Sequence, residues 1–208
     1  MTTHHNTQSL QGNNHNGNKA ITLDDIRSAL MDEFHFSTSL KEPEQFRQRQ
    51  REQHIYDITQ HEFDWFITLT FRYKKTDHDE VVSLGKKFFD LLSSEIYGKR
   101  SRNRIIHYSA IERHEDGSLH IHTLIKEPKP DAPIGMYGIR DLIKRNWFRV
   151  ASTNLDMTSS SSNPEDSWFE PVREGNILRL AGYMTKDCYR YDDTIIYDLC
   201  CLDGRKVG

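Results

Sequence analysis

Hydrophobic and polar positions follow two different periods along this chain, and together they predict a mixture of strands and helices. Runs dense in aromatic and β-branched residues, which favour buried strands, occupy 63–71, 105–113, 119–126 and 168–172. Segments with apolar residues every three or four positions, which favour helices packed on a sheet, occupy 22–36, 79–97, 136–150 and 176–189.

The clearest local signal is an Asp-Gly pair, Asp116-Gly117, between two of the strand patterns. Asp-Gly is typical of tight hairpin turns, so we expect 105–113 and 119–126 to pair antiparallel. The last strand pattern contains Pro171, which cannot donate a ladder hydrogen bond, and this favours an edge position.

Composition divides the chain into three parts. Residues 1–20 are rich in Asn, His and Gly without an apolar pattern, and we expect a disordered tail. Residues 21–60 predict a helical extension that begins at the capping residue Thr22 and includes a second, charged and Gln-rich helix from Pro43. Residues 61–208 are then the main domain, with a Ser-rich loop at 151–166.

The sequence predicts a soluble, intracellular protein with no membrane partner. No apolar run approaches the roughly 20 residues that cross a bilayer, and the N-terminus is polar where a secretory signal would be apolar. Cys188, Cys200 and Cys201 have neither metal-ligand spacing nor a disulfide framework, which fits a reducing compartment.

A net charge of −3 does not by itself indicate a nucleic-acid binder, but local basic clusters matter more for contacts than the total. The densest cluster contains Arg100, Arg102 and Arg104, and Arg72 leaves the first strand. These side chains are candidates for binding phosphate groups, with an ordinary solvated face as the alternative.

The strongest chemical signal is His120-Ile121-His122 within a strand pattern. Side chains alternate along a strand, so both imidazoles project from one face and can bind one divalent ion. Antiparallel pairing in the predicted hairpin can bring Glu112 across from them. Mixed oxygen and nitrogen ligands with open positions suit Mg²⁺ or Mn²⁺, and Zn²⁺ also fits two histidines.

A second signal is Tyr183 followed by Lys186, at helical spacing on one face of the segment 176–189. A tyrosine hydroxyl has an ordinary pKa near 10, so it attacks phosphorus only beside a cation or a metal-polarised phosphate. Such a pair is usually a core aromatic with an incidental lysine. Its combination with the predicted metal hairpin makes a nucleophile the better interpretation.

As a set, these motifs resemble the HUH endonuclease superfamily and, within it, the single-tyrosine rolling-circle replication initiators of small single-stranded DNA viruses and plasmids. The three motifs of that family occur here in order, at 66–71, 119–125 and 183–187. The stretch 111–117 resembles the segment that precedes the His-x-His pair in the viral initiators. The resemblance covers about 63–191.

The resemblance implies an α+β fold with a central antiparallel sheet of about five strands flanked by helices, as in RNA-recognition domains. It implies Glu112, His120 and His122 as ligands of Mn²⁺ or Mg²⁺, Tyr183 as nucleophile, and Lys186 as a neighbour that positions or neutralises. The residues expected to face single-stranded DNA are Thr68, Thr70, Arg72, Arg100, Arg102 and Arg104.

The implied reaction is sequence-specific nicking and rejoining of single-stranded DNA at a replication origin, possibly within a hairpin. Attack by Tyr183 gives a 5′-phosphotyrosine and a free 3′-hydroxyl that primes a polymerase. Because no Gly-x-x-x-x-Gly-Lys loop follows, we expect a host or element helicase to unwind the duplex, unless the chain is a fragment. The expected location is the cytoplasm of a prokaryotic host, or the host nucleus for a eukaryotic virus.

Other functions share parts of this pattern. A transposase or a plasmid-mobilisation relaxase would use the same chemistry on a different DNA substrate. A hydrolytic phosphoesterase with paired histidine motifs would need a second His-x-Thr unit, which the predicted core lacks. A non-catalytic DNA-binding module would form no covalent adduct through Tyr183.

Overall fold

A four-stranded antiparallel sheet forms the centre of the computed structural model, which describes residues 21–34, 42–128, 138–158, 168–188 and 190–205. The strands are β1 (Trp65–Leu69), β2 (His107–Arg113), β3 (Leu119–Ile125) and β4 (Phe169–Pro171), in the spatial order β2-β3-β1-β4. The predicted hairpin is confirmed, because β2 pairs with β3 along its whole length. β4 lies at an edge of the sheet, as Pro171 predicts.

The fold class is confirmed as α+β, but the described sheet has four strands where about five were expected. A later segment of the chain takes the place of a fifth strand beside β2. It forms only isolated bridges there, including Ala110 with Ile195 and His107 with Cys201. The 3₁₀-helix η1 (Tyr197–Leu199) interrupts the segment between these bridges, so no continuous ladder forms. The segment still covers an edge that would otherwise be open to pairing.

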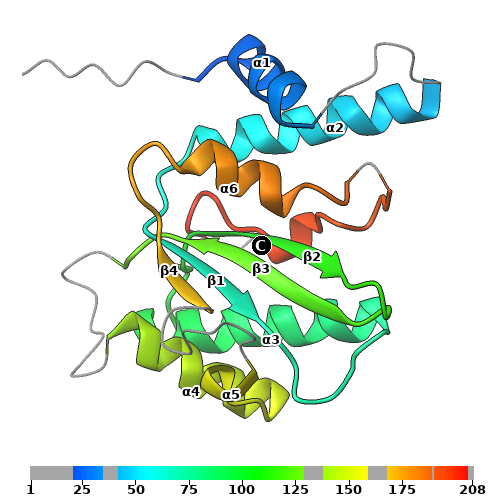
Figure 1. Ribbon diagram of the computed structural model, residues 1–208. Helices are drawn as coiled ribbons and strands as arrows, with labels where there is room; N and C mark the ends of the chain where they lie inside the picture. Colours follow the sequence, from blue (N-terminus) through cyan, green and yellow to red (C-terminus); the bar gives the residue numbers. More distant parts are fainter. Residues whose placement is uncertain (1–20, 35–41, 129–137, 159–167, 189, 206–208) are drawn as a thin grey trace, which may run out of the picture.

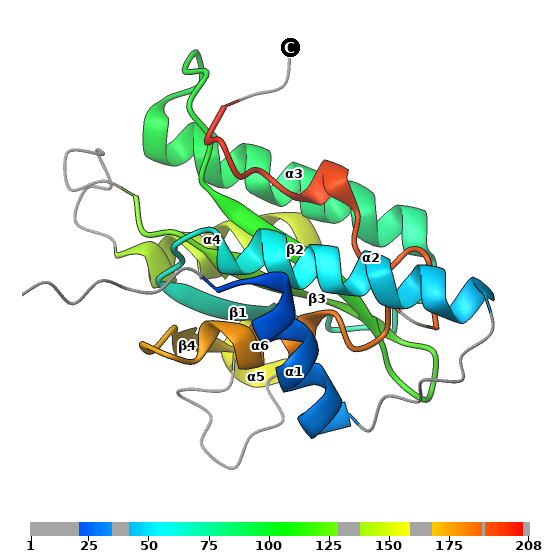
Figure 2. The same cartoon turned by 90° about the horizontal axis from the view of Figure 1, so that it is seen from above.

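Helices cover both faces of the sheet (Figure 1). One face carries α3 (His78–Tyr97), α4 (Ile139–Ala151) and the short α5 (Leu155–Thr158). The other face carries α6 (Ile177–Met184), with α2 (Glu42–Thr59) and then α1 (Leu23–Phe34) outside it. The view from above shows α2 and α1 as the outermost layer on that side (Figure 2).

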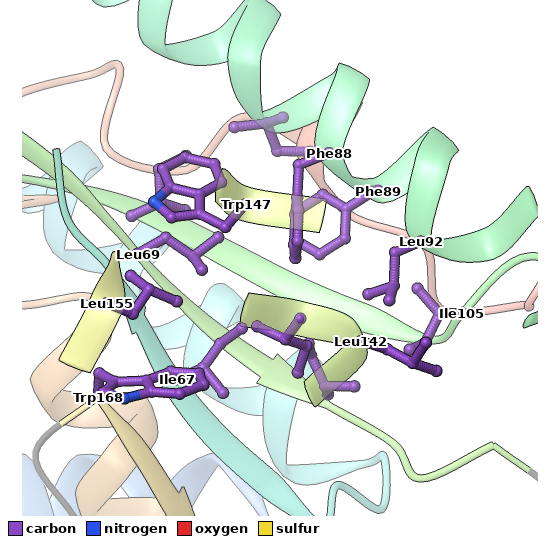
Figure 3. Close-up of a cluster of buried hydrophobic side chains, with 14 of the residues drawn as sticks. Ile67, Leu69, Phe88, Phe89, Leu92, Ile105, Leu142, Trp147, Leu155 and Trp168 are labelled. Atoms are coloured by element: carbon purple, nitrogen blue, oxygen red, sulfur yellow. The ribbon is translucent and has the colours of Figure 1, made fainter. Parts of the chain in front are cut away.

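Alternating strand residues face two separate hydrophobic clusters, as the period of a strand requires. Ile67 and Leu69 of β1 pack with Phe88 of α3 and Trp147 of α4 (Figure 3). The intervening residues face α6, and the cluster there joins sheet and helices. Its members include Ile26, Ile55, Phe66, Tyr108, Leu124 and Leu180. The N-terminal helices therefore share a core with the sheet.

The predicted helix 176–189 is shorter in the structure, because α6 ends at Met184 and 185–188 form a turn. The Thr185 hydroxyl donates to the carbonyl of Ala181 at 2.8 Å, and the Lys186 amide donates to the carbonyl of Tyr183 at 3.2 Å. This tighter three-residue bond replaces the helical pattern. Lys186 accordingly lies in the turn after the helix, which corrects its placement on the helix itself.

Two other predicted segments compare with the structure as follows. Part of the predicted Ser-rich loop 151–166 is regular, since Ala151 ends α4 and Leu155–Thr158 form α5. Its remaining residues, 159–166, and the predicted tail 1–20 lie outside the described residues. In the described part of the chain, no helix is long and apolar enough to cross a membrane.

Candidate metal and tyrosine site

Glu112, His120 and His122 converge on the face of the sheet that carries α6. Glu112 lies directly opposite His120 in the β2–β3 ladder, and His122 follows two residues along the same face. The Glu112 Oε2 atom is 2.5 Å from Nε2 of His122 and 3.2 Å from Nε2 of His120. The two Nε2 atoms are 2.9 Å apart. Three potential ligand atoms therefore meet at one point, as the hairpin pattern predicts.

The protonation of these groups favours a cation. Burial lowers the pKa of His122 to about 4, so its imidazole is neutral near pH 7. Burial alone would raise the pKa of Glu112, but hydrogen bonds with His120, His122 and Lys186 outweigh it and hold that pKa far below its ordinary range. A carboxylate and neutral imidazoles are the forms that bind divalent metal ions. These three residues fit such an ion by their chemistry.

Neighbouring side chains fix the orientation of the imidazoles. The Thr68 hydroxyl lies 3.1 Å from Nδ1 of His122, on the far side of the ring from Glu112, and Phe66 stacks on the same ring. Nε2 of His122 is thereby directed at the carboxylate. Nδ1 of His120 is buried without a hydrogen-bond partner in the described part of the chain, and the ring of His114 lies 4.4 Å from the His120 ring.

Tyr183 and Lys186 lie directly beside the triad. The Tyr183 hydroxyl donates a long hydrogen bond of 3.4 Å to Oε2 of Glu112, and its ring meets that of His122 edge-on. Lys186 forms an ion pair with Oε1 of Glu112, and its Nζ atom is 4.2 Å from the centroid of the Tyr183 ring. With 41% of its surface exposed, Tyr183 remains accessible to a ligand.

The electrostatics around Tyr183 oppose ionisation of the phenol in the metal-free protein. Burial raises its pKa above the ordinary value of 10, and the negative charge of Glu112 adds to this effect. Lys186 acts in the opposite direction. Burial would lower the pKa of Lys186, but the contact with Glu112 raises it, so its ammonium is charged. Additional positive charge at the triad would favour the phenolate.

The residues expected to face DNA are distributed differently. Thr68 supports His122, and Thr70 follows β1, where its carbonyl accepts a 2.7 Å hydrogen bond from the Trp147 indole. Arg72 is exposed, with its guanidinium 5.3 Å from the centroid of the Tyr73 ring.

The basic cluster Arg100, Arg102 and Arg104 lies away from the triad. It precedes β2, whose first residues pair with the end of β3, whereas Glu112 pairs near the start of β3. The cluster is therefore at the opposite end of the hairpin from the triad, and Arg104 is 3.7 Å from Asp90. The structure does not bring these arginines together with Tyr183.

Sequence reasoning missed a basic pocket next to the triad. The pocket has a volume of about 310 Å³. Its lining residues are Arg51, Glu112, Arg113, His114, Glu115, Lys186, Asp187 and Arg190. Arg113 directly follows Glu112, so its position in the predicted hairpin could have indicated it. Arg51 belongs to the N-terminal helix α2, and no sequence signal connects it to this site.

A comparison with known protein families places this geometry in context. The family model described as replication-associated protein ORF2 matches residues 64–188, which is more than half of the chain. The matched region begins just before β1 and ends in the turn after α6, so it contains the triad, Tyr183 and Lys186. No curated protein and no solved structure matches the chain. On the strength of the family match, the chain belongs to the replication-associated protein ORF2 family.

Proposed function

We propose that this protein initiates rolling-circle replication by nicking single-stranded DNA at an origin, with Tyr183 as the nucleophile. Family membership supports a role in initiating DNA replication and a DNA partner. The observation that carries the finer proposal is the Tyr183 hydroxyl, 3.4 Å from the Glu112 oxygen on which both imidazoles converge. A nucleophile needs this proximity to a site that can bind a cation and a phosphate.

Each residue of the site has a role in this proposal. Glu112, His120 and His122 would hold Mn²⁺ or Mg²⁺, which when bound polarises the scissile phosphate and orients it. The oxygen of Tyr183 loses its proton and attacks phosphorus. The bond from phosphorus to the 3′ oxygen breaks, and that oxygen takes up a proton. Lys186 stabilises negative charge on the phenolate from its position beside the ring.

The products follow from the balance of this exchange. One phosphodiester bond is replaced by another, so the 5′ end is linked to Tyr183 and a 3′-hydroxyl is released. That hydroxyl can prime a polymerase, and a helicase would supply the unwinding. The reverse attack of a 3′-hydroxyl on the phosphotyrosine rejoins DNA and frees Tyr183. A transposase or relaxase would use the same steps, so the DNA substrate is what distinguishes them.

A covalent-adduct assay tests this proposal. The purified chain is incubated with Mn²⁺ and a diverse pool of labelled single-stranded oligonucleotides, including hairpins, and resolved on a denaturing gel. We expect a shifted band that disappears with a chelator and in Tyr183→Phe. Tyr191→Phe is the matched control, because Tyr191 is also partly exposed and close in sequence, and its adduct should persist.

Two results would contradict the proposal. An adduct that survives in Tyr183→Phe would exclude Tyr183 as the attacking group. The absence of any adduct across the pool, with Mn²⁺ bound normally, would favour a non-catalytic DNA-binding module.

A further inference from the structure

Arg51 connects the N-terminal helix α2 to the end of α6, which carries Tyr183. Its Nη2 atom donates to the carbonyl of Gly182 at 3.0 Å, and its Nε atom donates to the Thr185 hydroxyl at 3.3 Å. Only 2% of its surface is exposed. Figure 1 shows α2 lying along the outer side of α6. Arg51 also precedes residue 64, where the family match begins.

The two contacts fall on either side of the proposed nucleophile in the sequence. Gly182 immediately precedes Tyr183, and Thr185 immediately precedes Lys186. Carbonyl groups in the last turn of a helix have no partner within the helix, so they depend on outside donors. A guanidinium is planar and rigid, and therefore fixes the relative position of its two acceptors better than an ammonium can. Its positive charge also suits the C-terminal end of a helix.

Packing alone does not account for a buried arginine at this position. Ile55 and Ile58 of the same helix already belong to the hydrophobic cluster between α2 and the sheet. His54 adds a 2.8 Å hydrogen bond to the Tyr108 hydroxyl on β2. A buried guanidinium costs desolvation energy that an apolar side chain avoids, so it favours one specific arrangement of the groups that it binds.

We propose that Arg51 is a positioning residue that holds Tyr183 and Lys186 against Glu112. The N-terminal helices are then part of the catalytic unit, although they lie outside the region that defines the family. This inference rests on the proposed function of Tyr183. Its consequence is that loss of Arg51 misplaces the nucleophile while leaving the metal ligands on β2 and β3 in place. A displacement of about 1 Å can lower a rate about 100-fold.

The test uses three variants of the full chain. Arg51→Met removes the fork, Arg51→Lys keeps a charge with fewer fixed donors, and Arg49→Met removes a charge from an exposed position on the same helix. For each variant we would measure the adduct rate at saturating DNA, the affinity for single-stranded DNA, the affinity for Mn²⁺, and amide hydrogen exchange.

The expected pattern separates positioning from general stability. Arg51→Met should lower the adduct rate about 100-fold, with Arg51→Lys intermediate and Arg49→Met unchanged. Affinities for Mn²⁺ and DNA should change less than threefold. Hydrogen exchange should accelerate at 182–188 while β2 and β3 stay protected. If Arg51→Met does not fold, the comparison of Arg51→Lys with Arg49→Met decides the question.

Specific outcomes would overturn the inference. A normal adduct rate in both Arg51 variants would do so, as would equal acceleration of exchange in β2, β3 and 182–188. If the wild-type chain forms no adduct, the proposed function fails instead. The exchange pattern then still reports whether Arg51 holds the turn after α6.

Discussion

Lys186 binds Glu112 through Oε1, whereas both imidazoles contact Oε2 of the same carboxylate. One side chain thus links the proposed nucleophile to the proposed metal ligands. The lysine ammonium also lies over the Tyr183 ring, so a change at any of these groups alters the electrostatic environment of the others.

The first prediction concerns this ammonium. Lys186 opposes the rise in the pKa of Tyr183 that burial and Glu112 cause, so Lys186→Met should raise that pKa further. The pH profile of adduct formation should move to higher pH. At neutral pH the rate should fall about tenfold for each pH unit of displacement. Single-turnover rates between pH 6 and 10 measure this. Lys87→Met, at an exposed position on α3, should leave the profile unchanged, and an unmoved profile in Lys186→Met would refute the assigned role.

A second prediction concerns the support of His122. The Thr68 hydroxyl contacts Nδ1 of this imidazole, and side chains in such positions typically contribute about 10- to 100-fold to metal affinity. Thr68→Val keeps the shape and removes the hydroxyl, so Mn²⁺ should bind about tenfold more weakly by calorimetry. Thr123→Val is a matched control, because Thr123 bonds to Ser109 on the opposite face of the sheet. Equal Mn²⁺ affinity in Thr68→Val and the wild type would count against Thr68 as a support.

A third prediction concerns acid stability. Burial lowers the pKa of His107, which stacks on Phe89 away from the triad, to about 4. The unfolded chain binds a proton at this residue near pH 6.5, whereas the folded chain does not until about pH 4. The free energy of unfolding should therefore fall as the pH decreases through that window, by up to about 1.4 kcal/mol per pH unit from this group.

Urea unfolding with a chelator, at several pH values between 4 and 7, measures the slope. His107→Gln should show a smaller slope, whatever its absolute stability. A slope identical to that of the wild type would show that His107 does not titrate in this way.

A fourth prediction distinguishes the two groups of arginines. Arg113 lines the pocket beside the triad, whereas Arg102 lies at the opposite end of the hairpin. For a short oligonucleotide, Arg113→Gln should weaken binding and reduce the salt dependence of log K by about 0.7. Arg102→Gln should have no effect on that substrate and should weaken binding only to longer DNA. The reverse order in fluorescence anisotropy would place the DNA on the other side of the sheet.

Local patterns in the sequence predicted the metal site because its geometry depends on a single hairpin. Asp116-Gly117 sets the turn, and the register of β2 with β3 then brings Glu112 opposite His120. Strand periodicity places His122 on the same face. These features involve residues close in the chain, where turn chemistry and alternation are strong signals.

Features that depend on distant contacts were not predictable in this way. Arg51 reaches Gly182 across more than half of the sequence, and a charged, Gln-rich helix gives no sign of a buried arginine. The early end of α6 depends on that same contact and on Thr185. The missing fifth strand has a similar origin, because η1 packs beside β2 instead of extending along it.

The most direct test of the central claim is to identify the atom that carries DNA after the reaction. The adduct is trimmed with nuclease, digested with protease and analysed by tandem mass spectrometry. We predict a nucleotide joined through its 5′ phosphate to Tyr183, together with a free 3′-hydroxyl on the released strand. A nucleotide on another residue, or cleaved DNA with no protein-linked product, would contradict the proposed function.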